Sequence, residues 1–301
     1  MAMFLTIRLR AAALLTGFAL VLSGCFMSPG KFTSELTLTG PDSFTFSYEG
    51  EIFFLTLSKL AMIGAANEET FTPSECFDEE SYESRACTKD ELASQRAEWE
   101  AGAAERAAKA KKDAEMMKAM MGGIDPTDPK AAEEMVRLLE RQKGWNRVVH
   151  KGDGLFEVSY SASGTLGHDF MFPTIEGFPA TNPFVQMILR DGGQVRINAP
   201  AFVFQNGDNP MAGMMGGMGS LAGLAAMGAA EADEKGGQAQ NIPSIPVLDG
   251  TFTIRTAPGM RILANNTDEG PQAAPGGGEI LRWTISQRTA TAPTALIAAA
   301  N

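Results

Sequence analysis

Histidine and cysteine are scarce in this chain, which has two histidines and three cysteines among 301 residues. The histidines, His150 and His168, are not accompanied by a nucleophile elbow, by zinc-ligand spacing or by a phosphate-binding loop. We therefore interpret both as residues on a surface or at the edge of a strand. The sequence predicts a protein that is not an enzyme and that holds no cofactor.

Basic residues are also in the minority. The chain has 25 lysines and arginines against 36 aspartates and glutamates, which gives a formal net charge of −11. Such a surface repels phosphate groups, so the composition excludes nucleic acid as a partner. Attachment to a membrane would then depend on acyl chains rather than on a basic patch.

The start of the chain lacks an apolar run that could span a bilayer. Ala11 to Leu22 has the length of a signal-peptide core, follows Arg8 and Arg10, and ends at small residues. A buried core helix is the alternative, but it gains little there because Ser28-Pro29-Gly30 follows. The pattern therefore predicts a secretion signal.

The residues that end this segment, Leu22-Ser23-Gly24-Cys25, resemble the lipobox of bacterial lipoproteins. The resemblance implies that the chain is cleaved before Cys25. The Cys25 thiol and the new amino group are then acylated by fatty acids such as palmitate. The lipid bilayer is then the partner of the acylated Cys25, and the protein faces the periplasm from the cell envelope. Phe26 stands where an aspartate would favour the inner membrane, so the usual rule for this class favours the outer membrane.

We therefore expect three parts in the chain. These are a signal peptide at residues 1–24, a lipidated tether at residues 25–30 and a single domain at residues 31–301. The domain is long enough to bury a substantial core.

Only Cys76 and Cys87 follow Cys25. In an oxidising envelope compartment, an even pair this close in sequence predicts a disulfide. Metal ligation and a reactive thiol are the alternatives, and neither has a histidine or a further cysteine nearby to support it.

Alternating apolar residues predict β-hairpins at both ends of the domain. Phe32, Leu36 and Leu38 share one face, Gly40 to Ser43 supplies a turn, and the alternation resumes at Phe44. The fold class is therefore α+β, with an antiparallel sheet built from N-terminal and C-terminal hairpins. The remaining predicted strands are Trp145 to Val149, Leu155 to Ala162, Phe184 to Arg190, Gln194 to Asn198, Thr251 to Arg255, Met260 to Leu263, Ile280 to Ser286 and Thr294 to Ala298.

A helical insertion at residues 88–143 interrupts the sheet. Thr88 and Glu91 have the spacing of a capping box, and a long helix poor in large apolar residues should run to about Met121. A second, shorter helix begins near Asp128-Pro129. We expect the two to form an antiparallel hairpin whose long leg projects into solvent. Glu51 to Ile63 fits either a strand or a helix, and its apolar spacing favours a helix.

Residues 207–243 form a segment rich in methionine, glycine and alanine. Its glycine content favours a flexible loop over a helix, although a segment that dips into lipid remains open. A minor alternative is Cu(I) binding by thioether sulfurs, since methionine also serves as a flexible apolar filler. The candidate ligands are Met211, Met214, Met215 and Met218.

Three short stretches near the end of the chain resemble the closing strands of LppM-type lipoprotein domains. These are Thr256-Ala257-Pro258-Gly259, Asn265-Asn266 and Glu279-Ile280-Leu281-Arg282-Trp283-Thr284. The resemblance implies a small α+β domain that binds envelope lipids. We therefore expect a membrane-anchored lipoprotein that binds a lipid or another apolar ligand. The alternative is a scaffold lipoprotein whose projecting helix recruits an envelope protein.

Overall fold

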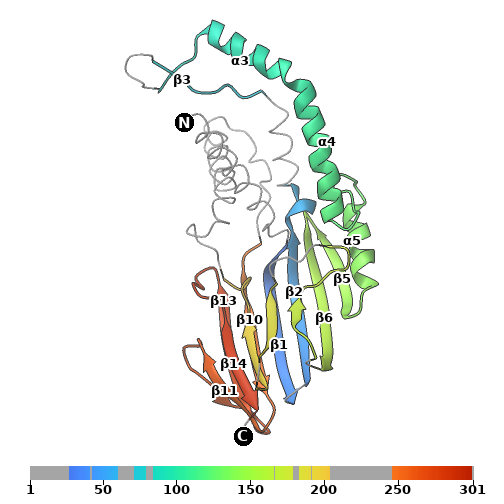
Figure 1. The fold of residues 1–301 in the computed structure, drawn as a ribbon, viewed down its shortest axis with the longest axis vertical. Coiled ribbons are helices and arrows are strands. Elements are labelled where there is room, and N and C mark those ends of the chain that lie inside the picture. Colours follow the sequence, from blue (N-terminus) through green and yellow to red (C-terminus); the bar gives the residue numbers. More distant parts are fainter. Residues whose placement is uncertain are drawn as a thin grey trace, which may run out of the picture.

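The chain folds into packed β-sheets with a long helical arm at one end (Figure 1). The computed structural model describes residues 27–40, 43–59, 71–78, 84–165, 167–178, 183–190, 192–203 and 246–299. Within these residues the chain forms α-helices and mixed and antiparallel sheets, which confirms the α+β class. Cys25, residues 1–24 and the Met-rich segment 207–243 lie outside the described residues.

The larger sheet has seven strands in the order β12-β13-β10-β1-β2-β6-β5. The neighbours β1 and β10 run parallel, so the sheet is mixed rather than purely antiparallel as predicted. This pairing places the N-terminal hairpin directly beside the C-terminal strands. The strands are β1 (Met27–Gly40), β2 (Ser43–Phe54), β5 (Trp145–Gly152), β6 (Leu155–Thr165), β10 (Asp249–Thr256), β12 (Gln272–Ala273) and β13 (Glu279–Ser286).

The smaller sheet has five strands in the order β11-β14-β9-β8-β7, all antiparallel. Its adjacent strands β8 and β9 correspond to the predicted strands Phe184 to Arg190 and Gln194 to Asn198. The strands are β7 (Phe170–Phe172), β8 (Val185–Arg190), β9 (Gln194–Asn198), β11 (Met260–Asn265) and β14 (Thr294–Ala299).

The two sheets pack against each other through aromatic rings. The ring centroids of Phe46 on β2 and Phe172 on β7 are 5.1 Å apart, and those of Tyr48 and Phe184 are 5.9 Å apart. Phe32 on β1 stacks on Phe202 at 4.2 Å. The aromatic face predicted for the first hairpin is therefore covered by the smaller sheet. We call the two packed sheets the sandwich.

Helices α3 (Lys89–Ala101) and α4 (Ala103–Met120) form the arm, and Gly102 separates them. The predicted capping box is confirmed, because Thr88 Oγ1 accepts from the backbone N–H of Glu91 and the Glu91 carboxylate accepts from that of Thr88. Neither helix contains a buried residue. The arm leaves the sandwich at the end where β1 begins (Figure 1).

Helix α5 (Ala131–Glu140) differs from the arm because it is amphipathic. It buries Met135 and Leu139 and packs on β5. It therefore belongs to the sandwich, and the predicted antiparallel pairing of two helices is replaced by this helix-on-strand contact. A hydroxyl-to-sulfur hydrogen bond of 3.0 Å from Thr56 to Met121 ties the end of α4 to the sandwich.

The prediction of a helix from Glu51 to Ile63 is wrong for residues 51–58; Lys59 is helical, and residues 60–63 lie outside the described ranges. Strand β2 continues to Phe54, and a single 3-10 turn, η1 (Leu55–Leu57), follows. Ile52, Phe53 and Phe54 are all buried. A strand that is buried on both faces loses the alternation that identifies strands, and this is why the spacing favoured a helix.

Strand β1 also begins earlier than expected. Met27 already pairs with Phe54, and Met27 is buried, so residues 27–30 belong to the sheet and not to the predicted tether.

Among the helices of the described residues, none has both the length and the hydropathy needed to cross a membrane.

Candidate functional site

The disulfide between Cys76 and Cys87 is present, as predicted, at the end of the arm, and their Cα atoms are 5.1 Å apart. It joins the short strands β3 (Cys76–Phe77) and β4 (Ser84–Arg85) to the start of α3. We call residues 71–78 and 84–88 the tip of the arm. The structure thus uses this cysteine pair to hold a loop against a helix.

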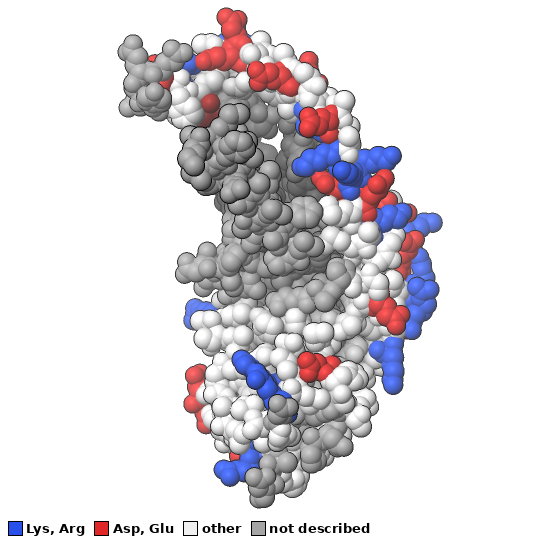
Figure 2. Space-filling model, in the orientation of Figure 1, with Lys and Arg blue, Asp and Glu red and all other residues white. Residues whose placement is uncertain are grey.

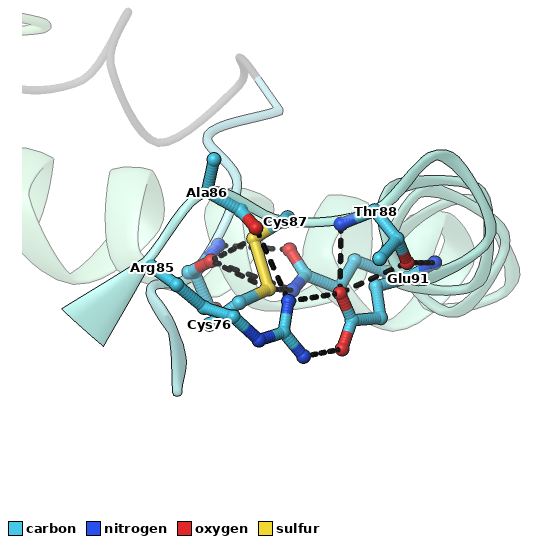
Figure 3. Close-up of polar contacts among 8 residues, drawn as sticks. Cys76, Arg85, Ala86, Cys87, Thr88 and Glu91 are labelled. Atoms are coloured by element: carbon cyan, nitrogen blue, oxygen red, sulfur yellow. Dashed lines mark hydrogen bonds and ion pairs between the residues drawn. A yellow bond between two sulfur atoms is a disulfide. The ribbon is translucent and has the colours of Figure 1, made fainter. Parts of the chain in front are cut away.

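Around the disulfide, Glu91 collects several hydrogen bonds (Figure 3). Arg85 donates to both of its carboxylate oxygens, at 2.7 and 2.9 Å, and the backbone N–H of Thr88 donates at 2.7 Å. The hydrogen bond from Arg85, followed by those from Thr88, lowers the pKa of Glu91 to about 2. This carboxylate is therefore a structural anion at neutral pH and is a poor proton donor or acceptor.

A second candidate site lies where strand β5 begins. Pairing between β5 and β6 ends at Trp145 and Tyr160, and the last bond on this side runs from the Ser161 N–H to the Gly144 carbonyl at 2.9 Å. Strand β6 continues to Thr165, still paired with β2 on its other side. Beside this free edge is a groove of about 850 Å³, which we call the β6 groove.

One wall of the β6 groove is aromatic. Phe170 lies between the two β2 rings, 5.0 Å from Phe44 and 5.3 Å from Phe46. Tyr160 packs edge-on against Trp145 at 5.3 Å. Phe170 and Tyr160 are only partly buried. These rings give the groove an apolar wall that continues the core of the sandwich.

The other wall carries hydroxyl groups from three neighbouring strands. Thr37, Thr45 and Ser163 lie in one cross-strand row, and Ser47 and Ser161 lie in the next. Asn146 donates to the Ser161 hydroxyl at 2.9 Å. The lining residues therefore come from both faces of the sheet, so the groove runs around the free edge of β6 from rings to hydroxyls.

The charged groups of the groove are few. Glu35 is engaged by Arg255 at 3.0 Å, whereas Lys143 forms no ion pair within the described residues. Burial raises the pKa of Tyr160, which keeps its phenol neutral over the physiological range. The groove is thus suited to binding through ring contacts and neutral hydrogen bonds.

The two histidines occupy separate places. His168 lines the β6 groove, whereas His150 on β5 packs on Phe156 at 4.9 Å. Across the described ranges, no three histidine, cysteine, aspartate or glutamate side chains come together as a possible metal site. The candidate copper ligands Met211, Met214, Met215 and Met218, like the candidate lipidation site Cys25, lie outside those ranges.

Sequence reasoning missed the groove residues. The available signal was the run Ser161-Ala162-Ser163-Gly164-Thr165, a strand end without any large side chain. Small residues at a strand edge leave open space beside the backbone, which larger side chains would fill.

Comparison with known proteins finds no matching family model, no matching curated protein and no matching solved structure.

Proposed function

We propose that this protein is a lipoprotein of the bacterial cell envelope that binds an amphipathic, lipid-like ligand in the β6 groove. The observation that carries the proposal is the pairing of an aromatic wall with a hydroxyl wall in a groove of about 850 Å³. Small-molecule sites commonly have volumes of about 300 to 1,000 Å³ and combine apolar linings with a few polar groups.

The chemistry of the two walls supports an amphipathic ligand. An acyl chain against the partly exposed rings of Phe170 and Tyr160 gains about 25 cal/mol for each Å² of apolar surface that it buries. A polar headgroup can exchange hydrogen bonds with the serine and threonine hydroxyls across the β6 edge. The ammonium group of Lys143 adds a preference for a headgroup that carries negative charge.

Acylation of Cys25 is the part of the proposal that rests on the lipobox-like sequence. Two residues of extended chain reach roughly 7 Å, so an anchor at Cys25 would hold the start of β1 close to a bilayer. From Met27 to Thr37 the strand rises roughly 33 Å at about 3.3 Å per residue. The arm leaves the sandwich at this same end, where β1 begins (Figure 1), so an anchor at Cys25 would bring the arm close to the bilayer as well.

Palmitate labelling tests the anchor. Labelled fatty acid should attach to the wild-type protein and be absent from Cys25→Ser, and only the wild type should partition with membranes. Equal labelling of both proteins would overturn the anchor without affecting the groove.

Ligand binding is tested with a fluorescent fatty acid and with mass spectrometry of lipid that co-purifies with the full chain. Phe170→Ala removes a half-buried ring of the groove and should weaken binding about tenfold, which corresponds to about 1.4 kcal/mol. The matched control is Met171→Ala, the next residue on β7, which is 40% exposed and does not line the groove. Equal affinity of the two variants would contradict a lipid site here.

A second candidate function is recruitment of an envelope protein by the arm. It is favoured by two helices without a buried residue and by Phe77 at the tip, which is 50% exposed. Figure 2 shows mainly acidic side chains over α3 and basic side chains mixed with acidic ones over α4, a charged surface that a partner of complementary charge would match. A photo-crosslinker at Phe77 should then capture a protein, while one at Val247 on the sandwich, 49% exposed, should not.

Cu(I) binding by the Met-rich segment remains a minor prediction. A copper titration of the wild type against a variant with Met211, Met214, Met215 and Met218 changed to leucine tests it. Unchanged affinity would remove this alternative.

A further inference from the structure

The five-stranded sheet has an unusual charge composition. Its strands contain three arginines, Arg190, Arg196 and Arg261, and not one aspartate or glutamate. The chain as a whole has a formal net charge of −11. The smaller sheet is therefore locally basic in an acidic protein.

Two of these arginines line one pocket of about 380 Å³. Arg190 and Arg196 stand on the adjacent strands β8 and β9, where Arg190 pairs with Gln194 and Arg196 pairs with Ile188. They are thus diagonal neighbours, with backbones roughly 7 to 8 Å apart, within reach of each other's long side chains. Leu296 and Ala264, in the same cross-strand row as Arg196, form the apolar floor.

Neither arginine has an acidic partner within the described residues. Arg147, Arg255 and Arg85 all form ion pairs, whereas Arg190 and Arg196 form none. The Nε of Arg196 donates to Asn198 Oδ1 at 3.2 Å, which directs its guanidinium group and leaves the terminal N–H groups available. Asp191, the residue after Arg190, lies outside the described residues.

We propose that this pocket binds a phosphate group. Two guanidinium groups offer paired N–H donors and two positive charges, which match the oxygens and the charge of a phosphate monoester. A carboxylate could form bidentate hydrogen bonds with only one of the two guanidinium groups. The apolar floor of Leu296 and Ala264 takes the organic part of the ligand. The phosphate belongs either to a soluble ester or to a lipid headgroup.

The site is independent of the β6 groove, since it lies on the smaller sheet and shares no lining residue with that groove. The phosphate proposal can therefore be supported or overturned separately from the proposed function. Phe170→Ala should leave phosphate binding unchanged, and the arginine variants should leave fatty-acid binding unchanged.

The test is calorimetric titration of the full chain with glycerol 3-phosphate at low salt. The wild type should bind saturably, Arg190→Gln and Arg196→Gln should each weaken binding at least tenfold, and the double variant should abolish it. The matched control is Arg282→Gln, an exposed arginine of β13 that lines neither pocket and forms no ion pair within the described residues. All the substituted side chains are exposed, so thermal unfolding should not change.

Vesicles separate the two sources of phosphate. If vesicles that contain phosphatidic acid, a phosphate monoester, bind the wild type but not the double variant, while glycerol 3-phosphate binds poorly, the ligand is a lipid headgroup. If glycerol 3-phosphate binds and vesicles do not, it is a soluble ester. If neither probe binds, or if binding is the same in the double variant, or if Arg282→Gln weakens it equally, the proposal is overturned.

Discussion

In the sandwich, Phe46, Phe172 and Phe252 are almost completely buried, whereas helices α3 and α4 of the arm contain no buried residue. The strands of the sandwich gain their stability from contacts between residues far apart in sequence. The arm depends on a few isolated contacts. Arg106 lies over the Trp99 ring at 4.1 Å across the Gly102 junction, and Arg96 lies over Phe71 at 4.8 Å.

This difference in contacts should give the arm a lower local stability than the sandwich. Isolated cation–π contacts at exposed sites contribute about 0.5 to 1 kcal/mol each, and a helix cap contributes about 1 kcal/mol. Burying one large apolar side chain contributes about 1.5 to 3 kcal/mol, and the sandwich buries many. We therefore expect the arm to open by itself, while the sandwich unfolds only as a unit.

The largest effect should come from the ring at the centre of the sandwich. Phe172 is fully buried and contacts Phe46, Tyr48 and Phe184. Phe172→Ala should lower the free energy of unfolding by about 3 to 5 kcal/mol, because the cavity is enclosed by rigid rings. Urea denaturation measures it. The matched control is Phe77→Ala at the tip, where exposure of the ring predicts a change within about 0.5 kcal/mol.

Next in size is the loss of the disulfide, which closes a loop with a sequence separation of 11. Replacing Cys76 and Cys87 by serine should destabilise the tip by about 2 to 3 kcal/mol, because the open loop gains conformational freedom. Hydrogen exchange should show faster exchange in the first turns of α3 and no change in β1, β2 or β6. An equal loss of protection in the strands would show that arm and sandwich are coupled, contrary to the comparison.

The sequence predicted local elements well and distant pairings poorly. Strands β5 and β6 were predicted from their alternating apolar residues, and the turn between them contains Asp153 and Gly154, whose φ angles are 51° and 74°. The cysteine pair was predicted from parity and spacing. The parallel pairing of β1 with β10 was not predicted. It joins strands more than two hundred residues apart, and neither strand contains a local sequence signal for its partner.

The β6 groove was beyond sequence reasoning for a related reason. Its opening depends on where β5 begins relative to β6, and that point is set by the chain path at Gly144, whose φ is 98°. A Cβ atom there would lie 2.6 Å from the Tyr160 ring and 2.9 Å from the Ser161 carbonyl. The turn therefore requires glycine, but the sequence alone does not reveal which strand edge that glycine leaves free.

A smaller effect is expected at the junction within the arm. Gly102 has φ −78° and ψ 0°, a helical conformation that alanine adopts freely. Its added Cβ would meet only the end of the flexible Arg106 side chain, at 2.9 Å. Gly102→Ala should therefore stabilise the arm by up to about 1 kcal/mol and raise the helical circular dichroism signal, with no change in the sandwich.

The matched control is Gly122→Ala, at the other end of α4. Gly122 has φ +63°, and a Cβ there would lie 3.0 Å from the Phe178 ring. This substitution should destabilise the protein. If both variants changed stability in the same direction, the backbone conformation at Gly102 would not explain the effect of the substitution there.

The smallest expected effect is a pH dependence of the local stability of the arm, which the sandwich should not share. The hydrogen bonds from Arg85 and Thr88 lower the pKa of Glu91 from 4.5 to about 2. A carboxylate with a lowered pKa contributes stability that is fully present above pH 4.5 and is lost as the pH falls through about 2. The first turn of α3 should therefore exchange its amide hydrogens faster as the pH is lowered across this window, after correction for the intrinsic exchange rate.

Glu91→Gln separates this carboxylate from the others, because a neutral amide keeps the shape of the side chain but does not titrate. In that variant α3 should already be less protected at neutral pH and should lose its pH dependence between about 4.5 and 2. A carboxyl NMR titration of the wild type that placed the Glu91 midpoint near 4.5 would mean that Arg85 is not engaged in solution. The tip would then be held by the disulfide and the Thr88 cap alone, and the arm would be looser than its hydrogen bonds indicate.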